Sequence, residues 1–201
     1  VYAVSDIHVD YPQNLEWVLG LDCQGYQADV LLLAGDVSED MMLLERVLRG
    51  CVERFAKVMF VPGNHDLWVR RCAYDCSLAK FEGILKLCRE LGVATEPFEY
   101  AGAEFLTLFS WYDFSFGSID RSLRLGWRDF YACSWPESLP DSHAITRYFH
   151  ELNSGVFEWI KTRSEHRDRE CHGLAPNPRI TCSHFLPAIE LMPSWVPESK
   201  R

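Results

Sequence analysis

The order of apolar runs in the first third of the chain limits its fold more than any other feature. Val30–Ala34 is a continuous apolar run of strand length, as expected for a strand that is buried on both faces. A helical apolar pattern follows over Met41–Phe55, and Lys57–Val61 is the next strand-like run, which Pro62 and Gly63 end. Strand–helix–strand order predicts parallel pairing with a right-handed crossover. The sequence therefore predicts an α/β fold.

The rest of the chain adds strands and helices on both sides of one irregular segment. We expect strands over Val1–Ser5, Val93–Phe98, Ala103–Ser110 and Arg179–Ser183, and helices over Asn14–Leu19, Cys76–Leu91 and Ser142–Ser164, the last bent near Gly155. Trp111–Pro140 has no regular pattern, and loops of this length usually carry function. His166–Pro178 reads as a polar loop. With 201 residues and no internal repeat, residues 1–201 are expected to form a single domain, incomplete at both ends.

Charge and composition exclude several classes of partner. The formal net charge is −9, whereas a nucleic-acid surface requires an excess of Lys and Arg, so we expect no nucleic-acid partner. No apolar run approaches the roughly 20 residues that a membrane helix needs, so no membrane partner is expected. The 8 cysteines form no CxxC pair, which indicates reduced thiols and an intracellular, cytoplasmic protein. A targeting segment before Val1 and the oligomeric state stay open.

Three short polar runs come directly after predicted strands: Asp6-Ile7-His8, Gly35-Asp36 and Gly63-Asn64-His65-Asp66. In an α/β sheet, ligand sites form at the carboxyl ends of the strands. Asp6 and His8 alternate, so in extended backbone both point to the same side and can reach one metal. A central Asp36 could bridge two cations with its two carboxylate oxygens. Carboxylate, imidazole and amide ligands together predict a metal site, in which two metals share a carboxylate.

Two further side chains extend this constellation. Asn64 offers an amide oxygen to a metal and an amino group to a phosphate oxygen. His65, if it is not a ligand, could donate a proton to a leaving alkoxide. His184 follows a fourth predicted strand. A lone histidine is more often a hydrogen-bonded core residue than a ligand, but the three other runs favour a ligand here.

In this order the motifs resemble those of the calcineurin-like metallophosphoesterases, and the resemblance covers nearly the whole chain. Family members carry DxH, GDxx(D/E), GNH(D/E) and a later lone His, which here are Asp6-Ile7-His8, Gly35-Asp36-Val37-Ser38-Glu39, Gly63-Asn64-His65-Asp66 and His184. Longer stretches also look like an uncharacterised plant and algal branch of the family, among them Gly63–Trp68, Phe109–Tyr112 and Ser183–Pro187. The resemblance implies a sandwich of two mixed β-sheets flanked by α-helices.

The resemblance also implies a ligand set for two divalent metal ions. Asp6 and His8 would bind the first metal, and Asp36 would bridge both. Asn64 and His184 would bind the second metal. Mixed oxygen and nitrogen sites accept Mn, Fe, Zn or Ni, so the identity of the metals stays open.

The catalytic roles implied by the resemblance fall on two residues. His65 would stay off the metals, contact the substrate phosphate together with Asn64, and act as the candidate general acid. Glu39 matches the acidic position that orients this histidine and stabilises its charged form.

The sequence departs from the family pattern in one respect. The family ends its motif series with GHxH, whose two histidines each bind one metal, and no GHxH occurs in these 201 residues. Either the chain continues past Arg201 into this motif, or the protein has lost the motif and its activity. We expect the first, because a chain that had abandoned catalysis would have no physical reason to keep the other ligands together.

The expected function is metal-dependent hydrolysis of a phosphoester by a phosphatase or a phosphodiesterase. A hydroxide that bridges the two metals would attack phosphorus in line, and His65 would protonate the leaving oxygen. The expected partner is a small phosphoester substrate. The alternative is a catalytically inactive scaffold of the same fold, which would bind a partner through Trp111–Pro140.

Overall fold

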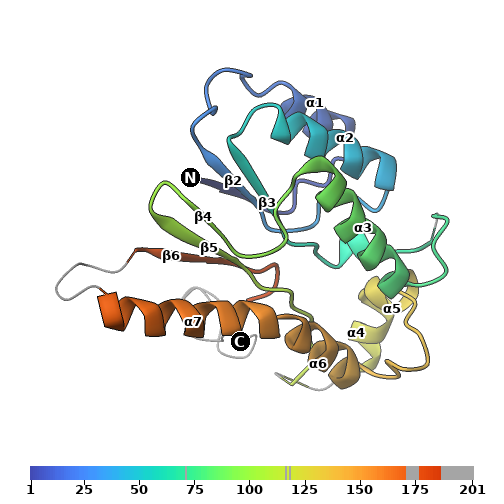
Figure 1. Ribbon diagram of the computed structural model, residues 1–201. Coiled ribbons are helices and arrows are strands. Elements are labelled where there is room, and N and C mark those ends of the chain that lie inside the picture. The colour runs from blue at the N-terminus through green and yellow to red at the C-terminus, as the bar shows by residue number, and fades with distance from the viewer. Residues whose placement is uncertain (71, 116, 118, 171–176, 187–201) are drawn as a thin grey trace.

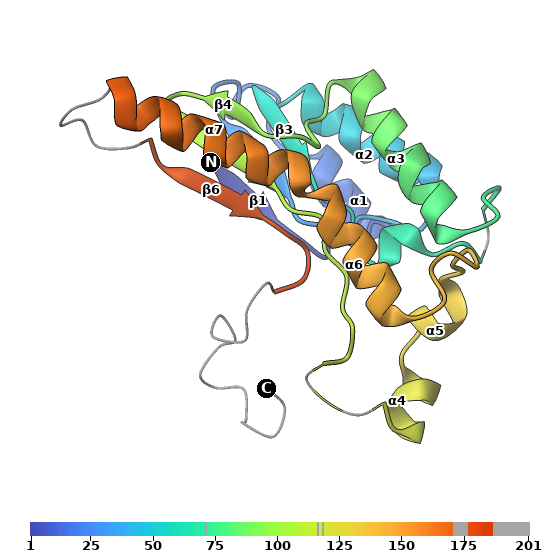
Figure 2. The same cartoon turned by 60° about the horizontal axis from the view of Figure 1, so that its bottom comes forward.

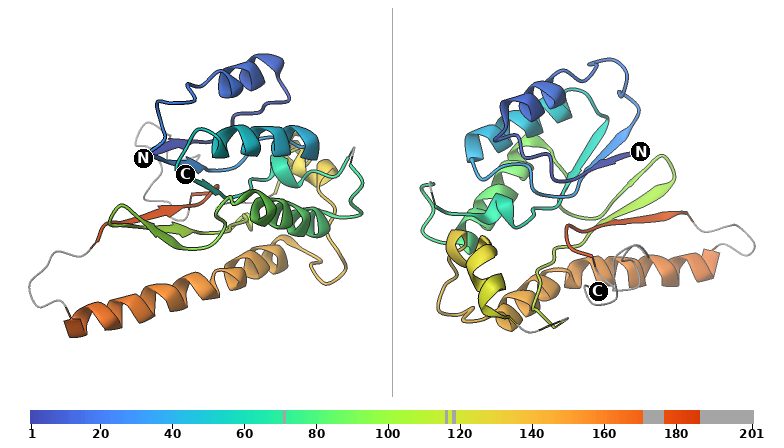
Figure 3. Two further views of the ribbon diagram at one scale, coloured as in Figure 1. Left: turned by 45° about the horizontal axis from the view of Figure 1, so that its top comes forward. Right: turned by 180° about the vertical axis from the view of Figure 1, so that it is seen from behind.

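The computed structural model describes residues 1–70, 72–115, 117, 119–170 and 177–186. For residues 165–170 it describes the backbone alone. Two three-stranded sheets lie face to face, with one group of helices on the outer side of each sheet (Figure 1). The further views agree on this order of layers, because α1 and α2 lie far from α7 in both (Figure 3). The predicted class, an α/β sandwich of two sheets flanked by helices, is confirmed.

The first sheet consists of β1 (Tyr2–Val4), β2 (Val30–Leu33) and β3 (Lys57–Phe60), in the order β1-β2-β3. Both pairings are parallel, as the strand–helix–strand pattern predicts. The crossovers contain α1 (Pro12–Leu19) and α2 (Met41–Val52). Parallel pairing brings the carboxyl ends of all three strands to one edge of the sheet, where the polar runs follow.

The second sheet consists of β4 (Phe98–Tyr100), β5 (Ala103–Thr107) and β6 (Arg179–Cys182). It is mixed, because β4 runs antiparallel to β5 and β6 runs parallel to it. The prediction of a strand over Val93–Phe98 is wrong for most of its length. Ala94 forms an isolated parallel bridge with Met59 of the first sheet, and Pro97 has no N–H with which to extend that ladder. This segment therefore leads the chain from the edge of the first sheet into the second.

Each face of the first sheet is buried against a different layer. Side chains from both sheets meet in one core cluster, which comprises Val30, Leu32, Met59, Val61, Phe105 and Cys182. On the other face, Leu31 and Leu33 pack in a larger cluster with residues of α2 and of α3 (Ser77–Leu91). All four residues of β2 are thus buried, which explains its continuous apolar sequence.

The helix predicted over Ser142–Ser164 is two helices, α6 (Ser142–Leu152) and α7 (Ser154–Glu170). Asn153 separates them, and its side chain bonds the backbone N–H and C=O of Phe109 at 2.9 and 2.8 Å. The break thus has a tertiary cause and falls before Gly155. The backbone of α7 also continues through 166–170, where a loop was expected, while residues 171–176 lie outside the described part. α7 runs along the outer side of the second sheet (Figure 2).

The irregular segment Trp111–Pro140 contains two short helices that sequence reasoning missed, α4 (Arg121–Gly126) and α5 (Asp129–Ala132). Both are too short to show helical periodicity in the sequence. The segment lies at the end of the molecule where α3 and α6 begin (Figure 1). No helix in the described part of the chain combines the length and apolar character needed to cross a membrane.

Candidate metal centre

The runs that follow β1 and β2 lie side by side in unusual backbone conformations. The Asp6 N–H donates to Gly35 O and the His8 N–H donates to Asp36 O, both at 3.0 Å. Asp6, His8 and Asp36 have φ angles of 54°, 46° and 56°. The left-handed region costs a non-glycine residue roughly 1 kcal/mol. The extended backbone predicted for Asp6 and His8 is therefore wrong, although both side chains still reach one cluster.

Two glycines allow the loops after β2 and β3 to meet. Gly35 has φ 86°, and a Cβ there would lie 2.5 Å from His184 Nδ1. A Cβ on Gly63 would collide with the Asp36 carboxylate and lie 2.7 Å from His184 Cε1. Any side chain at either position would push His184 away from the strand ends. The glycines of the GD and GNH runs thus make room for ligands rather than supply them.

Asp66 joins the same two loops from inside the fold. Its fully buried carboxylate accepts hydrogen bonds from the backbone N–H groups of Asp36, Val37 and Ser38 at 2.8–3.0 Å, and from that of Gly63 at 2.8 Å. Burial raises the pKa of Asp66, and the bonds from Gly63, Ser38 and Val37 oppose that rise. Sequence reasoning gave Asp66 no role, although its place after His65 at a strand end was a signal for one.

The first cluster consists of Asp6, His8 and Asp36. One ligand atom from each of the three side chains lies within 4.8 Å of the others. His8 Nε2 lies 4.0 Å from Asp36 Oδ2. Two carboxylates and an imidazole at this spacing can share one divalent cation.

The second cluster consists of Asp36, Asn64 and His184. His184 Nε2 lies 3.5 Å from Asp36 Oδ1 and 3.1 Å from Asn64 Oδ1. The other ring nitrogen, Nδ1, lies 2.7 Å from the carbonyl oxygen of Ala34, which can only accept a hydrogen bond. In neutral His184 the proton therefore sits on Nδ1, and Nε2 turns its lone pair toward two oxygen atoms that also carry lone pairs. A cation bound between His184 Nε2, Asp36 Oδ1 and Asn64 Oδ1 would accept a lone pair from each of these atoms, so this donor set fits a metal.

Burial raises the pKa of Asp36, while the neighbouring His184 lowers it. The Asp36 Oδ1 atom also accepts a hydrogen bond from the His65 N–H at 2.9 Å. A divalent cation would act in the same direction as His184 and favour the ionised carboxylate.

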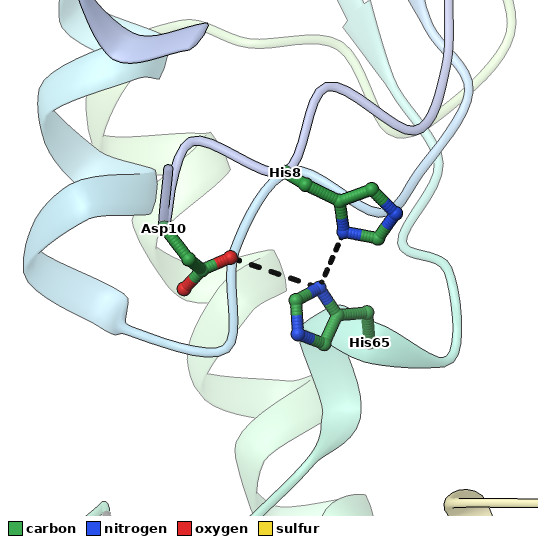
Figure 4. A group of neighbouring side chains, drawn as sticks. All are labelled: His8, Asp10 and His65. Atoms are coloured by element: carbon green, nitrogen blue, oxygen red, sulfur yellow. Dashed lines mark hydrogen bonds and ion pairs between the residues drawn. The ribbon is translucent and has the colours of Figure 1, made fainter. Parts of the chain in front are cut away.

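His65 lies beside the first cluster, and together with His8, which belongs to that cluster, and Asp10 it forms another group of side chains close enough to hold a metal ion (Figure 4). Its Nδ1 atom lies 2.9 Å from His8 Nδ1 and 3.8 Å from Asp10 Oδ2. The Ser38 hydroxyl holds Asp10 by donating to its other oxygen at 2.8 Å. Burial lowers the pKa of His65, and the charge of Asp10 opposes this shift.

Glu39, expected beside His65, has a different neighbour. Its carboxylate pairs with Arg70 at 3.3 Å. Within the described residues, the carboxylate in ion-pair range of His65 is that of Asp10, which sequence reasoning treated as a loop residue. The signal for it was an acidic residue two positions after His8, in the run that follows β1. The role of Glu39 toward His65 stays a prediction.

Comparisons with known proteins agree with this geometry. Residues 1–190 match the family profile described as "Calcineurin-like phosphoesterase". The [acyl-carrier-protein] phosphodiesterase PptH of Mycobacterium tuberculosis (strain ATCC 25618 / H37Rv) is 34% identical over an alignment of 125 residues, and the match covers 58% of this chain and 38% of that protein. The crystal structure of phosphopantetheinyl hydrolase (PptH) from Mycobacterium tuberculosis superposes with a TM-score of 0.64 and 26% identity, over 92% of this chain and 67% of that chain.

The chain thus spans 38% of the length of the curated relative, but the family profile covers most of the chain itself. Calcineurin-like phosphoesterases use divalent metals, and the described residues offer candidate ligands at the expected strand ends. On these grounds the chain belongs to the calcineurin-like phosphoesterase family.

Proposed function

We propose that this protein is a phosphodiesterase that holds two divalent cations, one in each cluster. The observation that carries the proposal is the placement of Asp36. Its Oδ2 atom faces His8 in the first cluster, and its Oδ1 atom faces His184 in the second. One carboxylate with its two oxygens turned to two separate donor sets is suited to bridge two cations.

The donor set fits Mn, Fe, Zn or Ni, because carboxylate, amide and imidazole ligands are acceptable to all four. Bound divalent cations would lower the pKa of a water molecule and neutralise charge on the phosphoryl group. His65 lies next to the first cluster, with Nδ1 2.9 Å from His8 Nδ1, so its other ring nitrogen, Nε2, is the one that would give a proton to the leaving oxygen. Asp10 is placed to stabilise the protonated ring that this role requires.

The relatives favour a diester over a monoester. PptH is named both an [acyl-carrier-protein] phosphodiesterase and a phosphopantetheinyl hydrolase. By this likeness, the first natural substrate to test is a phosphodiester that joins phosphopantetheine to an acyl carrier protein.

The test compares three substrates with the purified full-length protein loaded with Mn²⁺. These are bis(p-nitrophenyl) phosphate, p-nitrophenyl phosphate and phosphopantetheinylated acyl carrier protein, with release of the arm followed by mass spectrometry. We expect two bound cations per chain and faster cleavage of the diesters than of the monoester. Two bound cations with no cleavage of any phosphoester would instead indicate the inactive, partner-binding scaffold.

A further inference from the structure

Asn64 can bind a cation only if its amide faces the second cluster with the oxygen and not with the amino group. The two orientations have nearly the same shape, so packing alone does not select between them. We propose that Asp129, in the segment Trp111–Pro140, is a positioning residue that selects the metal-binding orientation. This inference rests on the proposed two-cation function and names a further residue on which the second cation depends.

The selection follows from the hydrogen-bonding capacity of a carboxylate. Asp129 is buried in α5, and its Oδ1 atom lies 3.0 Å from Asn64 Nδ2. An ionised carboxylate only accepts hydrogen bonds, so the amino group of Asn64 must face Asp129. The amide oxygen is then turned to the opposite side, where it lies 3.1 Å from His184 Nε2. Asp129 thus presents Asn64 Oδ1 to the second cluster without being a ligand itself.

Asp129 is itself held on both oxygens by a support network, which we define as Asp129, Trp68, Tyr112 and Trp127. The indole N–H of Trp68 donates to Oδ1 at 2.7 Å, and the hydroxyl of Tyr112 donates to Oδ2 at 2.5 Å. The indole N–H of Trp127 donates to that hydroxyl at 2.7 Å. Burial and the charge of Asp129 raise the pKa of Tyr112, so its hydroxyl remains a donor. Both carboxylate oxygens of Asp129 therefore accept hydrogen bonds from fixed donors, which hold the side chain beside Asn64.

A purely structural interpretation competes with this one. The support network also ties Trp111–Pro140 to the loop after β3, because Trp68 of that loop donates to Asp129. A backbone bond from the Val69 N–H to Ala132 O, at 2.8 Å, adds to this connection. On that interpretation, loss of Asp129 would lower stability but leave the second cation in place. On ours, loss of the carboxylate frees the Asn64 amide to turn, and the second cation binds more weakly. The two differ in metal binding, which can be measured without any catalytic assay.

The experiment is a Mn²⁺ titration by calorimetry of the wild type and matched variants. Asp129→Leu keeps the approximate size of the side chain but removes the acceptor that selects the amide orientation. Asp129→Asn would keep this acceptor, because the Trp68 indole N–H requires an oxygen at the Oδ1 position, to which Asn64 also donates. We expect one cation to bind as in the wild type and the other about 10- to 100-fold more weakly, as for other residues that orient ligands. Asp120→Asn is the control, because asparagine still caps α4 and the Asp120 carboxylate accepts hydrogen bonds from within its own turn. Tyr112→Phe removes a donor to Asp129 but leaves its bond to Asn64, so both cations should remain.

A double substitution makes the test specific for orientation. Asn64→Asp is combined with Asp129→Leu. A carboxylate at position 64 presents an oxygen to the cation in either orientation, so it does not need Asp129 to select one. We expect the double variant to bind the second cation more tightly than Asp129→Leu alone.

The outcomes separate this inference from the proposed function. The inference is overturned if Asp129→Leu binds both cations with wild-type affinity, or if the double substitution restores nothing. In either case a wild type that binds two cations and cleaves diesters leaves the proposed function standing. A wild type that binds fewer than two cations overturns both.

Discussion

The two donor clusters share Asp36 but are built in different ways. Asp6 and His8 of the first cluster come from one short run, and left-handed backbone aims them. The second cluster joins residues far apart in the chain, and hydrogen bonds to Ala34 and Asp129 orient His184 and Asn64. The His8 side chain is 34% exposed, whereas that of His184 is 8% exposed. The first cluster is thus a local construction, while the second depends on contacts that only the complete fold provides.

The largest effect should come from the residue that the clusters share. Asp36→Asn should abolish binding of both cations and lower diester cleavage by about a thousand-fold or more, because the bridging charge is lost. Metal analysis and kcat with bis(p-nitrophenyl) phosphate measure the two effects. Asp75→Asn, at an exposed position, is the control. If the Asp36 variant kept two cations, the clusters would not share this ligand.

Substitutions on either side of Asp36 should separate the clusters. His8→Ala and His184→Ala should each leave one bound cation and lower cleavage by about a hundred-fold, because each removes a donor from one cluster only. Mn²⁺ stoichiometry measures the difference directly. If either variant lost both cations, the clusters would form one cooperative site. The conclusion that the two clusters are built and filled separately would then be wrong.

His65→Ala tests whether His65 stands outside both clusters. We expect both cations to remain and turnover to fall about a hundred-fold, the usual size of a general-acid contribution. Metal content and kcat are measured on the same sample. Loss of metal equal to that of Asp36→Asn would instead make His65 a ligand.

Asp66→Asn should destabilise the two loops after β2 and β3, which carry residues of both clusters. Its carboxylate accepts four backbone hydrogen bonds between the loops after β2 and β3, and an amide would turn an N–H toward some of these donors. We expect the free energy of unfolding to fall by about 3 kcal/mol. Urea denaturation measures the change against Asp75→Asn. A loss below about 1 kcal/mol would show that the loops are held by other contacts.

The smallest expected effect compares two carboxylates near His65. Asp10→Asn should lower turnover about 10-fold, because Asp10 lies in ion-pair range of the imidazole. Glu39→Gln should change turnover by less than about two-fold, because the partner of Glu39 is Arg70 on a partly exposed surface. The measurement is kcat with metal content held equal. The reverse order of effects would support the orienting role that the family resemblance assigns to Glu39.

The same contrast explains what the sequence could predict. The parallel strands follow from local apolar patterns, and the candidate ligands come directly after these strands in the chain. Both could therefore be predicted from the sequence. Asp129 could not, because it lies in a segment without periodicity and acts through a contact 65 positions away along the chain. The break at Asn153 was missed for a similar reason, since a bond to Phe109 causes it. Tertiary hydrogen bonds decide these features, and they leave little trace in a single sequence.

The left-handed backbone at Asp6, His8 and Asp36 has a consequence for engineering. Glycine adopts these φ angles without the steric cost that other residues bear there. A directed-evolution screen for heat resistance alone would therefore reward glycine at the ligand positions themselves. Variants enriched in such a screen would fold well, but they would lose one cation when Asp6 or His8 is replaced and both when Asp36 is replaced. Libraries built on this scaffold should be selected for hydrolysis and thermal tolerance together.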